Sequence, residues 1–277
     1  MKRIYFAGGS WAAAIYIGIC KGLEEQYGTE YYKQFYFSGD SVGAFVALLC
    51  SLGYSSEQLE KIYTNLADLA RKNGVSGGKM SEYHELMLND IMVEDDIYKK
   101  LENNNFSFGV SNYWHKHKIY KSWKNNEHIK KTLHASFHIP FYCKYQGSLD
   151  DCFAYDGGFS MNNDILSQYD ITIGKSKCYD LSYDISLYDI IYPPSREAIK
   201  KHIAYGYVLS KNFDFDNVDK KKRQCIKYDI SLYILKFLVL LEIVLNEYVY
   251  PFMNTMLMFI KNIPKNINIF LKYFLKI

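Results

Sequence analysis

The sequence lacks several features that mark large classes of proteins. Its six cysteines are scattered and form no CxxC pair, which argues against a zinc-binding motif and a disulfide framework and predicts reduced thiols. No stretch has the roughly 20 uninterrupted apolar residues of a transmembrane helix, so we do not expect a clean membrane span. The N-terminus has neither the long apolar run nor the cleavage site of a signal peptide. We therefore expect a cytoplasmic protein.

Patterns that would bind a cofactor or a metal are also missing. The dinucleotide fingerprint GxGxxG is absent, which argues against a nucleotide cofactor. His115 and His117 flank Lys116, but no third ligand is suitably spaced, so we interpret both histidines as solvated surface. The sequence thus predicts neither a cofactor nor a metal.

Charge is unevenly distributed along the chain. The net charge is +3, yet residues 218–277 carry ten basic and four acidic side chains. Apolar stretches at 230–245, 248–260 and 267–277 accompany this surplus. A basic, apolar tail favours peripheral contact with a membrane or lipid droplet, although packed helices that complete the globule are the alternative. The tail has no helix-turn-helix, zinc or base-stacking pattern, so nucleic acid is not an expected partner.

Strands, glycine turns and helices alternate in the first 75 residues. We expect strands at 3–8 and 34–38, each followed by a helix, at 11–27 and 42–52, and a capped helix at 55–71. This order is typical of a mainly parallel α/β sheet with its site at the carboxyl ends of the strands. Farther on, we expect helices at 80–91, 95–102, 127–136 and 195–209 and strands at 153–156 and 170–174.

Ser41 is the strongest candidate for a nucleophile. It lies in Gly39-Asp40-Ser41-Val42-Gly43, a GxSxG pattern between an expected strand and an expected helix. In that context the serine occupies a sharp turn with its hydroxyl exposed, and the flanking Gly39 and Gly43 let the turn close.

Two further glycine motifs follow expected strands. Asp156, with Gly157 and Gly158 after it, can point a carboxylate into a site, although an ordinary Asp-Gly turn is the simpler explanation. Gly8, Gly9 and Ser10 can present backbone N–H groups to an anion. In a hydrolase that anion is the tetrahedral oxyanion, whereas a nucleotide phosphate or a plain turn are the alternatives.

These three motifs, in this order, resemble the patatin-like phospholipase family. The segments Ala135-Ser136-Phe137-His138-Ile139-Pro140 and Tyr155-Asp156-Gly157-Gly158-Phe159-Ser160 are similar to its adipose triglyceride lipase and adiponutrin branch, as is Phe6-Ala7-Gly8 followed by Ile15-Tyr16-Ile17-Gly18. The resemblance covers roughly residues 4–213. It implies a three-layer α/β/α core with a mainly parallel sheet. We expect a catalytic domain at 1–170, an accessory segment packed on the core at 171–217, and, from the charge and apolar pattern, a helical, basic and apolar membrane-associating tail at 218–277.

The resemblance also implies a chemistry. Ser41 attacks a lipid ester, Asp156 takes its proton, and the loop of Gly8, Gly9 and Ser10 binds the oxyanion, without a metal. The chain departs from the family's glycine loop at Ser10 and Ala13, and a positive φ at either position would distort that loop. A catalytically weak or inactive protein that binds lipid surfaces is therefore the alternative function.

A conventional catalytic triad is a second alternative for the same serine. His202 is the only histidine after Asp156, so Ser41, Asp156 and His202 follow the chain order of an α/β-hydrolase. Ser41 comes after only two expected strands, which is early for that fold.

Overall fold

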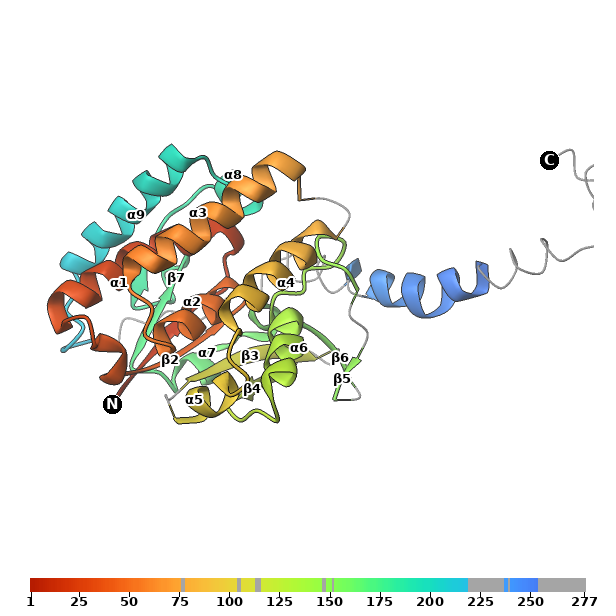
Figure 1. Cartoon of the computed structure of the whole chain (residues 1–277), viewed down its shortest axis with the longest axis horizontal. Helices are drawn as coiled ribbons and strands as arrows, with labels where there is room; N and C mark the ends of the chain where they lie inside the picture. Colours follow the sequence, from red (N-terminus) through yellow and green to blue (C-terminus); the bar gives the residue numbers. More distant parts are fainter. Residues whose placement is uncertain are drawn as a thin grey trace, which may run out of the picture. The chain divides into compact units, whose positions relative to one another are not determined.

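The strand that opens the chain is buried on both of its faces. In the computed structural model, β1 (Lys2–Phe6) points Ile4 and Phe6 into one apolar cluster and Tyr5 into another. Because alternate side chains of a strand point to opposite faces, β1 must lie inside a sheet that is covered on both sides. The structure describes residues 1–75, 78–103, 106–112, 116–145, 148–150, 152–218, 237–238 and 240–253 (Figure 1).

The sheet around β1 is mixed and mostly parallel. Its strand order is β5-β6-β3-β2-β1-β7-β8, and β4 pairs with β3 outside this path. The pairs β1–β2, β1–β7, β2–β3 and β7–β8 are parallel, whereas β3–β4, β3–β6 and β5–β6 are antiparallel. The other strands are β2 (Phe35–Asp40), β3 (Phe106–Asn112), β4 (His117–Tyr120), β5 (Ser148–Leu149), β6 (Cys152–Asp156), β7 (Ile171–Gly174) and β8 (Leu181–Ser182).

Within the described ranges, eight α-helices contribute residues to the larger of the two apolar clusters. They are α1 (Ala13–Tyr27), α2 (Val42–Ser51), α3 (Ser56–Asn73), α4 (Lys79–Ile91), α5 (Ile97–Asn103), α6 (Asn126–Ser136), α8 (Leu187–Ile191) and α9 (Arg196–Lys211). The predicted cap of α3 is confirmed, because the Ser55 side chain accepts a hydrogen bond from the Gln58 N–H and Gln58 returns one to the Ser55 N–H.

Helices α1 and α9 pack with their backbones nearly in contact. A Cβ at Gly18 would collide with the carbonyl oxygen of Ile203, and one at Gly206 would collide with that of Ile15. Glycine on both helices therefore permits the close approach that Figure 1 shows, where α9, α1 and α3 run beside one another.

The opposite face of the sheet has a thinner cover. Tyr5 and Ala7 pack there against Met161, Ile165, Leu166 and Tyr169, which come from α7 (Asn163–Leu166) and the residues beside it. The predicted α/β class with flanking helices is thus confirmed. Among the described residues, α7 is the only α-helix that contributes side chains to the smaller cluster.

Four strands were missing from the sequence-based assignment, namely β3, β4 and the two-residue strands β5 and β8. Residues 106–120 gave no strand prediction, yet β3 and β4 lie there, and β3 joins β2 to β6. The sequence of β3, FSFGVSN, contains two serines and a glycine that are buried together with its apolar residues. Because these residues are common in polar loops, the sequence did not indicate a buried strand. The antiparallel pairing of β6 was not foreseen either.

The chain divides into two compact units, Met1–Tyr228 and Asp229–Ile277. β7 and α9 belong to the sheet and the helical cover of the first unit, so residues beyond 170 help to form its core. In the second unit, the described residues 237–238 and 240–253 are helical and include a π-helical turn, Leu245–Val249. None of the helices in the described ranges has the length and apolarity needed to cross a bilayer. The rest of the predicted apolar tail lies outside the described residues.

Candidate active site

Ser41 occupies a strained turn between β2 and α2. Its backbone has φ 55° and ψ −131°, a conformation that non-glycine residues rarely adopt and that costs on the order of 1–3 kcal/mol. The turn closes tightly, because a Cβ at Gly43 would collide with the Phe6 carbonyl and one at Gly39 with the backbone of Gly43. The strand–turn–helix context expected for a nucleophilic serine is therefore present.

The main chain of Ser41 is held by a neighbouring helix. Its N–H donates to the Ser136 hydroxyl over 3.0 Å, and that hydroxyl donates to the Gly109 carbonyl over 2.7 Å. Ser136 ends α6, so the turn is tied to both α6 and β3.

Sheet pairing brings Asp156 to Ser41. Asp40 pairs with Gly109 of β3, and Val110 next to it pairs with Asp156 at the end of β6. The Ser41 side chain interacts with the Asp156 carboxylate and lowers its pKa, and the Gly158 N–H donates a hydrogen bond to Asp156 Oδ1 over 2.9 Å. Both side chains are nearly buried, with Ser41 5% and Asp156 4% exposed. The structure thus brings the two predicted catalytic residues together.

The surroundings of Asp156 make it a stronger base than an ordinary carboxylate. Burial raises its pKa to about 7, although the interaction with Ser41 and the hydrogen bond from the Gly158 N–H lower it. A carboxylate with a pKa near neutral pH is suited to accept a proton from a serine hydroxyl.

The glycine loop lies against this pair. A Cβ at Gly8 would lie 3.2 Å from the Ser41 Cβ and 3.6 Å from Asp156 Oδ1, so Gly8 contacts both side chains. Of the two departures from the family's loop, Ser10 has a positive φ of 47°, whereas Ala13 has a helical φ of −51°. The condition for a distorted loop, a positive φ, is therefore met at Ser10 and not at Ala13.

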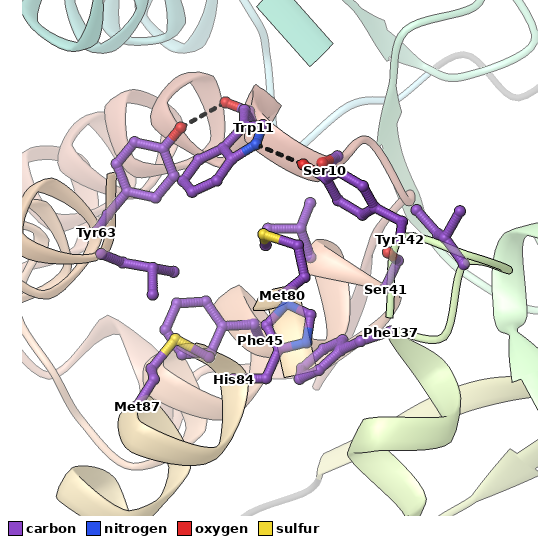
Figure 2. A pocket seen from close by; sticks show the side chains of 13 residues that line it. Ser10, Trp11, Ser41, Phe45, Tyr63, Met80, His84, Met87, Phe137 and Tyr142 are labelled. Atoms are coloured by element: carbon purple, nitrogen blue, oxygen red, sulfur yellow. Dashed lines mark hydrogen bonds between the residues drawn. The ribbon is translucent and has the colours of Figure 1, made fainter. Parts of the chain in front are cut away.

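An apolar pocket opens beside Ser41 (Figure 2). Its empty volume is about 520 Å³, a figure that includes open solvent at its mouth. The lining residues are Ser10, Trp11, Ser41, Val42, Phe45, Tyr63, Leu66, Met80, His84, Met87, Phe137, Ile139 and Tyr142.

Hydrogen bonds fix the aromatic side of this pocket. The Tyr63 hydroxyl donates to the Trp11 carbonyl over 2.6 Å, and Trp11 Nε1 donates to the Tyr142 hydroxyl over 3.1 Å (Figure 2). Burial lowers the pKa of His84 to about 3, and the neighbouring His134 contributes to the decrease. His84 is thus neutral at physiological pH, and the pocket presents no cation.

One functional candidate escaped the sequence analysis. The expectation of a solvated His117 is wrong, because its side chain is 1% exposed and its Nε2 lies 2.9 Å from Asp40 Oδ2. No sequence signal joined these residues, since their contact depends on the unpredicted strands β3 and β4. His115 lies outside the described residues.

Because the Ser41 side chain acts on Asp156 itself, a histidine is not needed to couple the two residues. His202 lies on α9, where burial lowers its pKa and Asp189 is its charged neighbour. In the described part of the chain, no group of three or more His, Cys, Asp or Glu side chains could hold a metal ion. Four cysteines, Cys20, Cys50, Cys143 and Cys178, are buried free thiols, as the sequence predicted.

Comparison with known proteins agrees with this geometry. The patatin-like phospholipase family matches residues 4–167, which include the glycine loop, Ser41 and Asp156. Comparison with curated proteins gives no match for the chain. Because the family match covers more than half of the 277 residues, the chain belongs to the patatin-like phospholipase family, whose members are lipid acyl hydrolases.

Proposed function

We propose that this protein hydrolyses acyl esters of lipids, with Ser41 as nucleophile and Asp156 as general base. The observation that carries the proposal is the buried Ser41 side chain beside a buried carboxylate with a pKa of about 7, next to an apolar pocket. No histidine is required, because Asp156 can accept the proton directly.

The reaction proceeds through an acyl-enzyme. Asp156 takes the hydroxyl proton while Ser41 Oγ bonds to the ester carbonyl carbon, and the resulting oxyanion is stabilised by backbone N–H groups of the loop formed by Gly8, Gly9 and Ser10. The intermediate then collapses, the C–O bond to the lipid alcohol breaks, and Asp156 protonates the departing alcohol. Water attacks the acyl-enzyme with Asp156 again as base, which releases the fatty acid and restores Ser41.

The pocket favours an acyl chain as the bound group. Phe45, Met80 and Met87 offer apolar surface, and the neutral His84 adds no charge. Methionine side chains adapt their shape to flexible partners, which suits a hydrocarbon chain. The lipid class is decided by a screen of phospholipid, lysophospholipid and triacylglycerol substrates.

Two sequence-based predictions accompany this proposal and are not tested by the structure. One is the similarity to the adipose triglyceride lipase and adiponutrin branch. The other is peripheral binding of residues 218–277 to a membrane or lipid droplet, which would place the enzyme at its substrate.

Fluorophosphonate labelling tests the proposal. The native chain is expected to label, and Ser41→Ala and Asp156→Asn are expected to lose labelling. Ser167→Ala and Asp164→Asn are matched controls, because both residues are exposed at the short helix α7 and should label like the native chain. A folded native chain that fails to label contradicts the enzyme proposal and favours the alternative, a lipid-surface binding protein, which vesicle sedimentation would then measure.

A further inference from the structure

A second buried pair of ionisable side chains lies behind the catalytic pair. Asp40 precedes Ser41 at the end of β2, and His117 begins β4, on the far side of β3. Asp40 Oδ2 and His117 Nε2 are 2.9 Å apart, and the two side chains are 0% and 1% exposed. The GxSxG pattern requires no carboxylate at the position of Asp40, so the pattern does not explain this pair.

Glycines on two neighbouring segments leave the space that the pair occupies. A Cβ at Gly109 of β3 would collide with both Asp40 and His117. A Cβ at Gly157 would lie 2.7 Å from Asp40 Oδ1, and Gly157 directly follows Asp156. The pair thus packs against the backbone that carries the catalytic carboxylate.

We propose that Asp40 and His117 are positioning residues for Asp156. Their buried pair holds the turn at the end of β6, and the positive charge of His117 offsets the effect of the negative charge of Asp40 on Asp156. The inference rests on the proposed function of Asp156. Neither residue is assigned contact with substrate or with the reacting atoms.

The charges around Asp156 give this role a direction. Burial lowers the pKa of His117, but the attraction and hydrogen bond of Asp40 outweigh burial and raise it. For Asp156, burial is the main effect; beyond it, Asp40 raises the pKa of the base and His117 lowers it, with Asp40 the stronger of the two.

Other ionisable groups near the pair are phenols that stay neutral. Burial raises the pKa of Tyr5 on β1 and of Tyr179 well above the usual value, and that of Tyr169 to about 12, with Asp40 adding to each increase. Across the working pH range, Asp40 and His117 are therefore the neighbouring groups whose charges act on Asp156.

Two variants with opposite expected effects test the inference. The acid limb of the pH profile of kcat/KM for p-nitrophenyl butyrate reports the pKa of the base in the free enzyme. His117→Gln removes the positive charge and should move this limb to higher pH by about one unit. A nearby charge typically changes a pKa by about 1–3 units, and we expect the lower end of that range. Asp40→Asn removes the stronger influence and should move the limb to lower pH. His202→Gln, on α9, is the matched control and should leave the limb in place.

A double variant separates charge from packing. Asp40→Asn with His117→Gln removes both charges but keeps two side chains that can hydrogen-bond, so its limb should lie between those of the single variants. If the pair only supported the fold, the variants would have a lower kcat/KM, but the acid limbs of their pH profiles would not move in opposite directions. Cooperative thermal unfolding of each variant shows that it is folded.

A second readout does not depend on activity. The ¹³Cγ signal of Asp156, identified by its absence in Asp156→Asn, should titrate at higher pH in His117→Gln and at lower pH in Asp40→Asn. If these shifts appear in a chain that does not react with fluorophosphonate, the pair stands and the hydrolase proposal fails. If labelling is intact but the two variants titrate like the native chain, the role of the pair is overturned.

Discussion

Replacing Asp156, the proposed general base, should stabilise the protein, and the gain should grow with pH. The pKa of Asp156 is about 7 in the folded chain because the group is buried, against about 3.9 for an unfolded aspartate. Between these values the folded chain keeps a proton that the unfolded chain releases. The free energy of unfolding therefore falls as pH rises from about 4 to about 7, and the loss is complete above pH 7.

The size of the effect follows from the same linkage. Each pH unit inside this window lowers the free energy of unfolding by about 1.4 kcal/mol, so the step from pH 5 to pH 8 lowers it by about 3 kcal/mol. Asparagine has a similar shape and does not titrate. The difference in the free energy of unfolding between Asp156→Asn and the native chain should therefore be about 3 kcal/mol larger at pH 8 than at pH 5, in favour of the variant.

Urea unfolding at pH 5, 6, 7 and 8 measures this difference. Asp164→Asn serves as the control, because Asp164 is exposed and its replacement should give a difference that hardly changes with pH. If the stability difference between Asp156→Asn and the native chain does not depend on pH, Asp156 has no raised pKa and is a poor candidate for the base.

Three further predictions concern the turn, the loop and the pocket. Ser10→Gly should be about 1 kcal/mol more stable than Ser10→Ala in thermal unfolding, because only glycine relieves the positive φ; equal stability would show that Ser10 is unstrained. Gly43→Ala should lose about 3 kcal/mol or more in urea unfolding, because its Cβ would collide with a backbone carbonyl, and a loss below about 1 kcal/mol would contradict the tight turn. Met87→Trp should lower kcat/KM for long-chain esters about tenfold relative to short-chain esters, because the ring fills the pocket, whereas Leu86→Trp on the exposed face of α4 should not.

The predictable part of the site came from local patterns. Gly39, Ser41 and Gly43 lie within five residues, and their chemistry needs only a strand before them and a helix after them, which short windows of sequence can indicate. Pairing Ser41 with Asp156 required the family resemblance, because the two residues meet through β3, a strand that the sequence analysis missed.

The unpredicted part depends on long-range packing. His117 was assigned to the surface because no third metal ligand is suitably spaced near it in the sequence, and only the β3–β4 pairing carries it to Asp40. Likewise, the sequence could identify Ser10 and Ala13 as departures from a glycine loop, but which of them needs a positive φ depends on where η1 (Ser10–Ala12) turns into α1.

The glycine contacts between α1 and α9 have a consequence for how the protein is made. Helix α1 follows the glycine loop almost directly, but α9 lies beyond residue 167, where the family match ends. A chain that emerges from the ribosome must therefore wait until α9 has been synthesised before Gly18 and Gly22 find their partners. Since translation adds roughly 5–20 residues per second, the helix that follows the glycine loop spends about 10–40 seconds with an uncovered face. During synthesis, this interval is when the nascent chain most needs protection from aggregation.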